Sequence, residues 1–254
     1  MKLFDIPVPQ VNLGDVFTLG KHRLMCGDAT SMDHIKTLIN GVLVDMVLTD
    51  PPYGIKVQNK NGKVGGGSFG RASSLNYKTG LKARSYSIFE GDNDTGVAIA
   101  AIGHIKTINP KVQIIWGGNY FADQLPASSC WIVWDKVNGT TDFADAELAW
   151  TNQKTAVRIF KHMWNGVCRA SEPTCHGPRI HPTQKPIALS EWCMGKYGEK
   201  AGTVLDLFGG SGSTLMACEK LGKSCLTMEI MPYYCGKIIE RWQNTTGKIA
   251  AKLC

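Results

Sequence analysis

Asp50, Pro51, Pro52 and Tyr53, which follow the apolar run 46–49, are the residues with the clearest capacity for chemistry. The Asp50 carboxylate and the Pro51 carbonyl are adjacent acceptors, and together they fit the two hydrogens of an amino group, such as the exocyclic NH2 of a nucleobase. The prolines fix the backbone and remove N–H donors that would compete for these acceptors. Tyr53 adds an aromatic face on which a base could stack. The simpler alternative is a rigid turn that only ends a strand.

A second feature is the run 203–220, TVLDLFGGSGSTLMACEK, which predicts a strand, a glycine turn and a helix. Such a turn lets the backbone approach a ligand closely and directs the positive end of a helix toward it. The spacing excludes a phosphate-binding P-loop. That motif needs a glycine five residues before Gly-Lys-Ser, and the residue at that distance from Gly222-Lys223-Ser224 is Ala217. It also departs from the Gly-x-Gly-x-x-Gly pattern, because the third glycine position is Leu215.

Glu229 ends the next predicted strand, where a carboxylate can bond ribose hydroxyls. A nucleoside without a pyrophosphate fits both this acid and the glycine turn, and we therefore predict S-adenosylmethionine as the cofactor. A methyl donor beside an NH2 site predicts methyl transfer to the amino nitrogen, with Asp50 next to the developing positive charge. A base in a duplex has to be flipped out to reach such a corner.

The elements that must position these residues alternate between short apolar strands and helices, which predicts an α/β fold. The expected sheet is mostly parallel, with helices on both faces. The acids and one amide that follow the strands fall at their carboxyl ends, where open sheets bind ligands. For Asp28, capping of the following helix is an equally good interpretation. The expected strands are 22–28, 44–50, 112–119, 130–136, 202–208 and 224–230. The expected helices are 33–40, 186–198, 213–222 and 232–242. The strand-end residues are Asp28, Asp50, Asn119, Asp135, Asp206 and Glu229.

Length and composition predict one domain over residues 1–254, since 254 residues with 43% hydrophobic content can bury one good core. The net charge of +7 indicates a polyanionic partner. Much of the positive charge lies in segment 55–89, which has no acid and no clear periodicity. We predict that this segment is a DNA-binding loop. Its cations are Lys56, Lys60, Lys63, Arg71, Lys78, Lys82 and Arg84.

The nine cysteines include no CxxC pair, which favours free thiols in a reducing cytosol. Cys168, Cys175, His176 and His181 lie close together, but their spacing matches no usual zinc motif, and we predict no metal site. No apolar run is long enough to cross a bilayer, and we expect no leader before the domain. We expect a cytoplasmic protein, without membrane contact, of a bacterium, an archaeon or a phage-infected host cell.

Three motifs together resemble those of the amino-group DNA methyltransferases: DPPYG (50–54), HPTQKP (181–186) and DLFGGSGST (206–214). Within that family, they resemble most the permuted beta group. The stretches WIVWDK and FADAELAW are similar to short phage and prophage members. The resemblance implies a Rossmann-like S-adenosylmethionine-dependent fold with circularly permuted motif order, and base binding by the Asp-Pro-Pro-Tyr corner. It implies cofactor contacts by Asp28, Thr183, Gln184, Lys185, Asp206, Phe208, Gly210, Gly212, Ser213, Thr214 and Glu229, with Thr183 to Lys185 at the methionine end.

By the same resemblance, an aspartate in the first motif position is typical of enzymes that modify adenine N6. The substrate implied is double-stranded DNA, and segment 152–180 is a short target-recognition segment. The oligomeric state stays open, with a homodimer as one expectation. Three alternatives remain: an N4-cytosine enzyme of the same fold, a protein-glutamine methyltransferase and a non-catalytic DNA-binding module. The glutamine enzymes resemble Asn-Pro-Pro-Tyr with an upstream glycine loop, from which this chain departs, and an intact Asp50 argues against a non-catalytic module.

Overall fold

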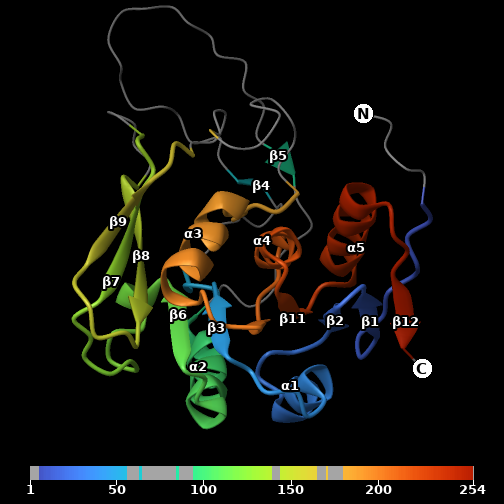
Figure 1. The fold of residues 1–254 in the computed structure, drawn as a ribbon, viewed down its shortest axis with the longest axis horizontal. Helices are drawn as coiled ribbons and strands as arrows, with labels where there is room; N and C mark the ends of the chain where they lie inside the picture. The colour runs from blue at the N-terminus through green and yellow to red at the C-terminus, as the bar shows by residue number, and fades with distance from the viewer. Residues whose placement is uncertain are drawn as a thin grey trace, which may run out of the picture.

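The computed structural model describes residues 6–55, 63–64, 84–85, 94–138, 144–164, 170 and 180–253. Within these ranges the centre is a ten-stranded sheet in the order β12-β1-β2-β11-β10-β3-β6-β8-β7-β9 (Figure 1). Strands β1 and β8 are antiparallel to their neighbours, and the other pairs are parallel. The strands are β1 Val16–Leu19, β2 His22–Cys26, β3 Met46–Thr49, β6 Val112–Trp116, β7 Trp131–Asp135, β8 Ala146–Thr151, β9 Arg158–Lys161, β10 Thr203–Asp206, β11 Ser224–Glu229 and β12 Ala251–Leu253.

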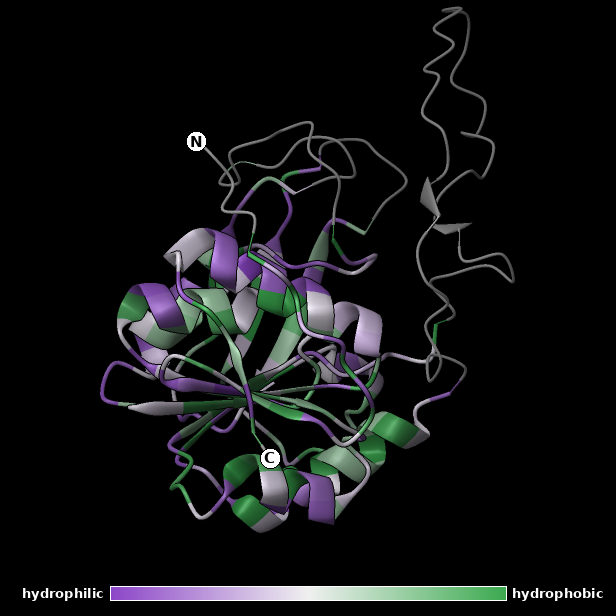
Figure 2. Cartoon of the chain, turned by 90° about the vertical axis from the view of Figure 1, so that its right-hand side faces the viewer, coloured by the Kyte–Doolittle hydropathy of each residue, from purple (hydrophilic) through white to green (hydrophobic). Residues whose placement is uncertain are grey.

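Helices cover both faces of this sheet, as Figure 2 shows with the sheet seen edge-on. The helices are α1 Met32–Ile39, α2 Gly96–Ile108, α3 Ile187–Tyr197, α4 Ser213–Leu221 and α5 Pro232–Thr246, with a short 3-10 helix η1 at Gly118–Tyr120. Buried side chains of α3, α4 and α5 form one core and those of α1 and α2 form the other. Strand β3 serves both, since Met46 and Leu48 join the first core and Val47 the second. The predicted fold class, a mostly parallel sheet with helices on both faces, is confirmed.

Strand order explains how two distant parts of the sequence meet. Strands β10 and β11, from the C-terminal part of the chain, lie between β2 and β3. The strand that leads to Asp50 is therefore paired directly with the strand that leads to the glycine turn. Thr49 at the end of β3 donates a hydrogen bond to Asp206 at the end of β10, 2.9 Å between oxygens. The Asp-Pro-Pro-Tyr corner comes first in the chain and the glycine turn later, and the two motifs follow the ends of the adjacent strands β3 and β10.

A buried histidine ties the layers together beside β1. His22 is fully buried, and its Nδ1 accepts a hydrogen bond from the Cys225 amide at 3.0 Å. Nε2 therefore carries the proton and donates to Glu219 on α4 at 2.7 Å. Glu219 also accepts from the indole of Trp242 on α5 at 3.0 Å. One carboxylate thus joins β2, α4 and α5, and burial lowers the pKa of His22 although Glu219 opposes that effect.

Several expectations on composition fall partly outside the described ranges. The described cysteines are buried free thiols at positions Cys26, Cys130, Cys193, Cys218, Cys225 and Cys235. Cys168, Cys175 and His176 lie outside the described residues. In segment 55–89, the described backbone includes a two-residue antiparallel pair, β4 Lys63–Val64 with β5 Arg84–Ser85. Among the described helices, none is long and apolar enough to span a bilayer.

Candidate active site

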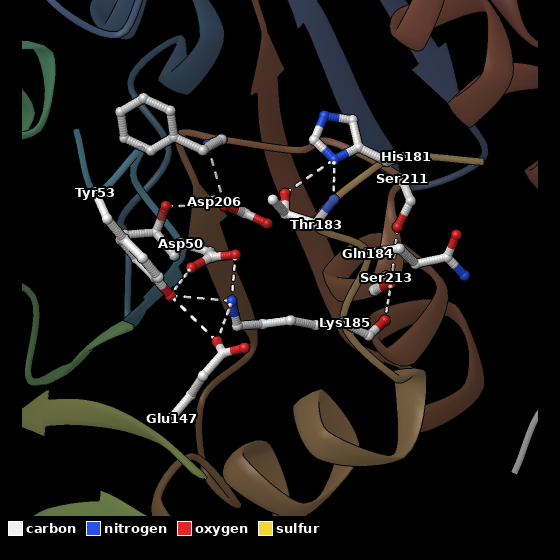
Figure 3. A network of polar contacts seen from close by, with 12 residues as sticks. Asp50, Tyr53, Glu147, His181, Thr183, Gln184, Lys185, Asp206, Ser211 and Ser213 are labelled. Atoms are coloured by element: carbon white, nitrogen blue, oxygen red, sulfur yellow. Dashed lines mark hydrogen bonds and ion pairs between the residues drawn. The ribbon is translucent and has the colours of Figure 1, made fainter. Parts of the chain in front are cut away.

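The carboxylate of Asp50 lies just beyond β3 and is held by two side chains (Figure 3). Its Oδ1 accepts a hydrogen bond from the Tyr53 hydroxyl at 2.6 Å. Its Oδ2 is 2.5 Å from the Lys185 ammonium nitrogen. Burial raises the pKa of Asp50, and the positive charge of Lys185 opposes that rise. The corner therefore presents a carboxylate in a desolvated setting, followed by the buried Pro51 and the half-buried Pro52.

The ring of Tyr53 is positioned by a glycine after β6. Gly117 has φ +69°, and a side-chain Cβ there would lie 2.1 Å from Cε1 of Tyr53. Residues other than glycine are therefore excluded by space as well as by backbone conformation. The ring of Tyr53 also stacks on that of Tyr120, with centroids 4.9 Å apart and planes 15° apart. Sequence reasoning did not find Gly117 or Tyr120, although the Gly-Gly-Asn-Tyr run directly after a buried strand was a usable signal.

Lys185 lies at the Asp50 corner, whereas the resemblance to the methyltransferases implied a contact with the methionine end of the cofactor. Its Nζ is 3.1 Å from the Tyr53 hydroxyl and 3.0 Å from Glu147 Oε2, in addition to its contact with Asp50. Asp50 and Glu147 raise the pKa of Lys185 above its usual value, although burial acts in the opposite direction. Lys185 is therefore a charged ammonium that two carboxylates share.

Glu147 is a site residue that the sequence analysis missed. It belongs to β8, and because β8 runs antiparallel to β6 and β7, its first residues lie at the carboxyl edge of the neighbouring strands. Its Oε1 is 2.5 Å from Lys136 Nζ, just after β7. Burial alone would raise the pKa of Glu147, but Lys185 and Lys136 together lower it to about 2. Glu147 is thus ionised beside the corner.

The glycine turn between β10 and α4 makes close backbone contacts. A Cβ on Gly209 would lie 2.7 Å from Thr227 Oγ1, so the turn packs directly on β11. Gly210 and Gly212 have φ +51° and +75°, and Gly212 is the N-cap of α4. The Gly210 amide donates to Glu229 Oε2 at 2.8 Å. The turn is therefore fixed by the acid that ends the adjacent strand.

Two buried acids lie at this turn. Asp206 Oδ1 accepts hydrogen bonds from the Thr49 hydroxyl and from the Phe208 amide, the latter at 3.1 Å. Glu229 Oε1 accepts from the Met231 amide at 2.9 Å. Burial raises the pKa of each acid to about 7. Neither has a lysine or arginine partner among the described residues, so this part of the site favours a ligand that is cationic or rich in hydroxyl donors.

The HPTQKP segment lies against the start of α4 and precedes α3. Its Lys185 carbonyl accepts a hydrogen bond from the Ser213 hydroxyl at 2.7 Å. His181 is buried, its Nδ1 lies 3.1 Å from the Thr183 hydroxyl, and burial followed by the charge of Lys185 lowers its pKa to about 3. Gln184 is also buried. The segment therefore connects the glycine turn to the Asp50 corner.

Asp28 lies at the same edge of the sheet, where the Gly27 amide donates to the Glu229 carbonyl at 3.0 Å. Its carboxylate accepts from the amide and the hydroxyl of Thr30, both at 2.8 Å. The N-cap of α1 is Ser31, whose hydroxyl accepts from the His34 amide. The interpretation of Asp28 as a helix cap is wrong, because the two residues after it form a turn before the helix begins.

The family model for N6 and N4 methyltransferases, described as DNA methylase, matches residues 44–241. The chain belongs to this DNA methylase family. A search among curated proteins found no match to the methylase.

Two solved structures with TM-scores above 0.5 have the same fold as the methylase. One is a putative DNA modification methylase from Thermus thermophilus complexed with S-adenosyl-L-methionine, at 16% identity and TM-score 0.51, covering 89% of this chain and 96% of that one. Another is PvuII DNA methyltransferase (cytosine-N4-specific), at 14% identity and TM-score 0.51, covering 91% and 90%. The complex of M1.HpyAVI with SAM has 21% identity and TM-score 0.47, with 86% and 98% covered.

The predicted DNA-binding residues of the methylase lie largely outside the described ranges. Lys56, Lys60, Arg71, Lys78 and Lys82 are outside them, and only the backbone is described at Lys63 and Arg84. In segment 152–180, positions 165–169 and 171–179 are likewise not described. The assignment of both segments to DNA contact stays a prediction.

Proposed function

We propose that this DNA methylase transfers a methyl group from S-adenosylmethionine to the exocyclic N6 of a flipped-out adenine in double-stranded DNA. The observation that carries the proposal is the pairing of β3 with β10, which puts the Asp50 corner and the glycine turn at adjacent strand ends joined by the Thr49–Asp206 hydrogen bond. An amino-binding corner and a nucleoside-binding turn at one edge are what transfer between two bound molecules requires.

The glycine turn fits S-adenosylmethionine by its donor and acceptor groups. The backbone at Gly210 and Gly212 takes left-handed conformations at the start of α4. Glu229 offers carboxylate oxygens to ribose hydroxyls, and the negative charge of Asp206 favours a cationic ligand. When bound there, the cofactor supplies an activated methyl group. Phe208, Ser213, Thr214 and Asp28 are proposed to complete its site, with Thr183 and Gln184 on the segment that faces α4.

The Asp50 corner supplies the groups that activate the base. Its carboxylate accepts one amino hydrogen and the Pro51 carbonyl accepts the other, which draws the nitrogen toward a tetrahedral shape and exposes its lone pair. Asp50 is then beside the positive charge that develops on the nitrogen, and burial, which raises its pKa, suits it to accept the released proton. Pro52 keeps the backbone rigid, and Tyr53 provides the aromatic face for the base.

Cytosine N4 is the second candidate acceptor, because the amino geometry at Asp50 is shared and a similar solved structure is named as cytosine-N4-specific. Aspartate in the first motif position supports adenine through the resemblance stated above. The deciding experiment is expression of the methylase in a host without DNA methylation, followed by nucleoside mass spectrometry and mapping of modified positions. N6-methyladenine is expected. N4-methylcytosine alone would replace the proposed base, and unmodified DNA would contradict the proposed function.

Replacement of Asp50 tests the assigned chemistry. Asp50→Ala removes a contact that strengthens in the transition state, so methyl transfer is expected to be lost while cofactor affinity changes little. Asp33→Ala is the matched control, since its side chain is 94% exposed on α1. Transfer is measured with tritiated cofactor and affinity by calorimetry. Transfer by Asp50→Ala at the rate of the unchanged protein would refute the role of Asp50.

A further inference from the structure

Both oxygens of Asp50 are engaged by side chains of the protein itself. Tyr53 donates to Oδ1 and Lys185 to Oδ2, at 2.6 and 2.5 Å. In the proposed function, the amino group of the base has to bind this same carboxylate. The base therefore competes with two internal donors, and these donors need another acceptor because a buried donor without a partner is costly.

Glu147 is within reach of both donors (Figure 3). Its Oε2 is 3.0 Å from Lys185 Nζ and 3.3 Å from the Tyr53 hydroxyl. Each donor thus lies between two carboxylates in the structure. A small displacement toward Glu147 would free Asp50 without leaving either donor unsatisfied.

The position of Glu147 is itself fixed. Its other oxygen, Oε1, contacts Lys136 at 2.5 Å. Glu147 is paired with Trp134 in the β7–β8 ladder, and the Lys136 amide donates to the Asp145 carbonyl at 2.9 Å. Trp116 also borders the site, with its ring centre 5.7 Å from Lys185 Nζ. The receiving carboxylate is therefore held in place by a hairpin rather than by a flexible loop.

We propose that Glu147 is a positioning residue that receives Lys185 and Tyr53 when the amino group of the base binds Asp50. This inference rests on the proposed function and assigns it a further residue. Replacing Glu147 by an uncharged residue would leave Lys185 attracted to Asp50 alone. The base would then compete against a stronger contact, and Asp50 would bind its proton less tightly.

The charged and titratable groups that face these carboxylates set the sign of the expected pH effect. Asp50 is approached by Tyr53 from its own turn, Lys185 from the HPTQKP segment, Glu147 from β8 and Asp206 from β10. The negative charge of Glu147 raises the pKa of Asp50. Loss of that charge therefore moves the acidic limb of a pH–rate profile to lower pH.

The test is Glu147→Gln, which keeps the shape of the side chain and removes its charge. The matched control is Glu191→Gln: like Glu147, Glu191 has a side chain 22% exposed and a lysine partner, Lys220 at 2.8 Å, but it lies on α3 outside the site. Glu147→Gln weakens the contacts of Lys185 and Tyr53 with residue 147, because the amide is uncharged. We therefore expect kcat for methyl transfer to fall about tenfold or more. Cofactor affinity should change by less than about twofold.

The outcomes separate the inference from the function beneath it. A fall in kcat with an acidic limb at lower pH, folded protein and retained cofactor affinity, and an unaffected control, supports the positioning role. An unchanged profile, or a loss of activity together with cofactor affinity or folding, overturns it. Failure of the unsubstituted protein to methylate any DNA instead refutes the proposed function, and the inference falls with it.

Discussion

Asp206→Asn is expected to stabilise the ligand-free methylase, by an amount that grows with pH. In the folded protein Asp206 is buried, with 3% of its surface exposed, and burial raises its pKa from 3.8 to about 7. Because the folded pKa is above the unfolded value, ionisation costs folding free energy. The stability associated with this group is complete below pH 3.8 and is lost as the pH rises to about 7. Asparagine avoids that loss and still accepts from Thr49 and Phe208.

The size of the effect follows from the separation of the two pKa values. Each pKa unit corresponds to about 1.4 kcal/mol, so the shift of Asp206 costs about 4 kcal/mol at pH 8 and about 1.5 kcal/mol at pH 5. The stability advantage of Asp206→Asn should therefore increase by about 2.5 kcal/mol between these pH values. Constant differences between the two side chains, such as an altered contact with Thr214, cancel in this comparison.

The assay is denaturant unfolding of both proteins at several pH values from 5 to 8, without cofactor. Asp33→Asn serves as the control and should follow the unchanged protein at every pH, because its side chain is exposed. If the difference in unfolding free energy between Asp206→Asn and the unchanged protein is the same at pH 5 and pH 8, the assignment of a raised pKa to Asp206 is refuted. A stability difference that moves against Asp206→Asn as the pH rises from 5 to 8 would refute it as well.

Two further predictions concern the base corner and the DNA contact. Gly117→Ala should lower stability by at least about 1 kcal/mol and methyl transfer by about tenfold or more, because its Cβ would displace Tyr53 from Asp50 and alanine disfavours φ +69°. Denaturant unfolding and tritium transfer measure the two effects, with Gly103→Ala on α2 as the control, since a Cβ there meets nothing within 4 Å. Gly117→Ala with unchanged stability and transfer would contradict the prediction. Neutralising Lys56, Lys60 and Lys63 should reduce the slope of log affinity against log salt by about 0.9 for each phosphate that is no longer neutralised, measured by DNA titration; an unchanged slope would assign DNA binding to another surface.

The central strands could be predicted from sequence because both of their faces are buried. A strand such as β3, with Met46, Val47 and Leu48 all buried, is a continuous apolar run that ends at a polar residue. Most residues of β2, β10 and β11 are likewise buried, and this made the strand-end acids visible. Pro232, predicted at the start of the last helix, is the first residue of α5.

Three of the elements that were missed, β9, β12 and α2, lack this signal. Strand β12 is exposed along its length and β9 nearly so, because both lie at sheet edges and have little apolar surface to hide. Helix α2 contains apolar residues on all sides, so no helical period stands out in it. Glu147 could not be predicted from strand ends, because the carboxyl ends of the parallel strands form this edge, whereas β8 runs the other way and presents its beginning there.

The contact between the Lys185 side chain and Asp50 could not be predicted from the motif. The motif located the residue beside the glycine turn, and its backbone does contact Ser213 there. The side chain, however, is long, and its ammonium group extends to the neighbouring corner, where two acids attract it. The sequence motif locates the backbone of such a residue, whereas the position of its ammonium group depends on charges brought near it by the tertiary structure.

Lys185 therefore belongs to two binding sites at once, through its carbonyl at the start of α4 and through its ammonium group at Asp50. A ligand that shifted the first contact and, through Lys185, the second would link the affinities of the two sites. By thermodynamic reciprocity, whichever factor the donor imposes on base affinity, the base imposes on donor affinity.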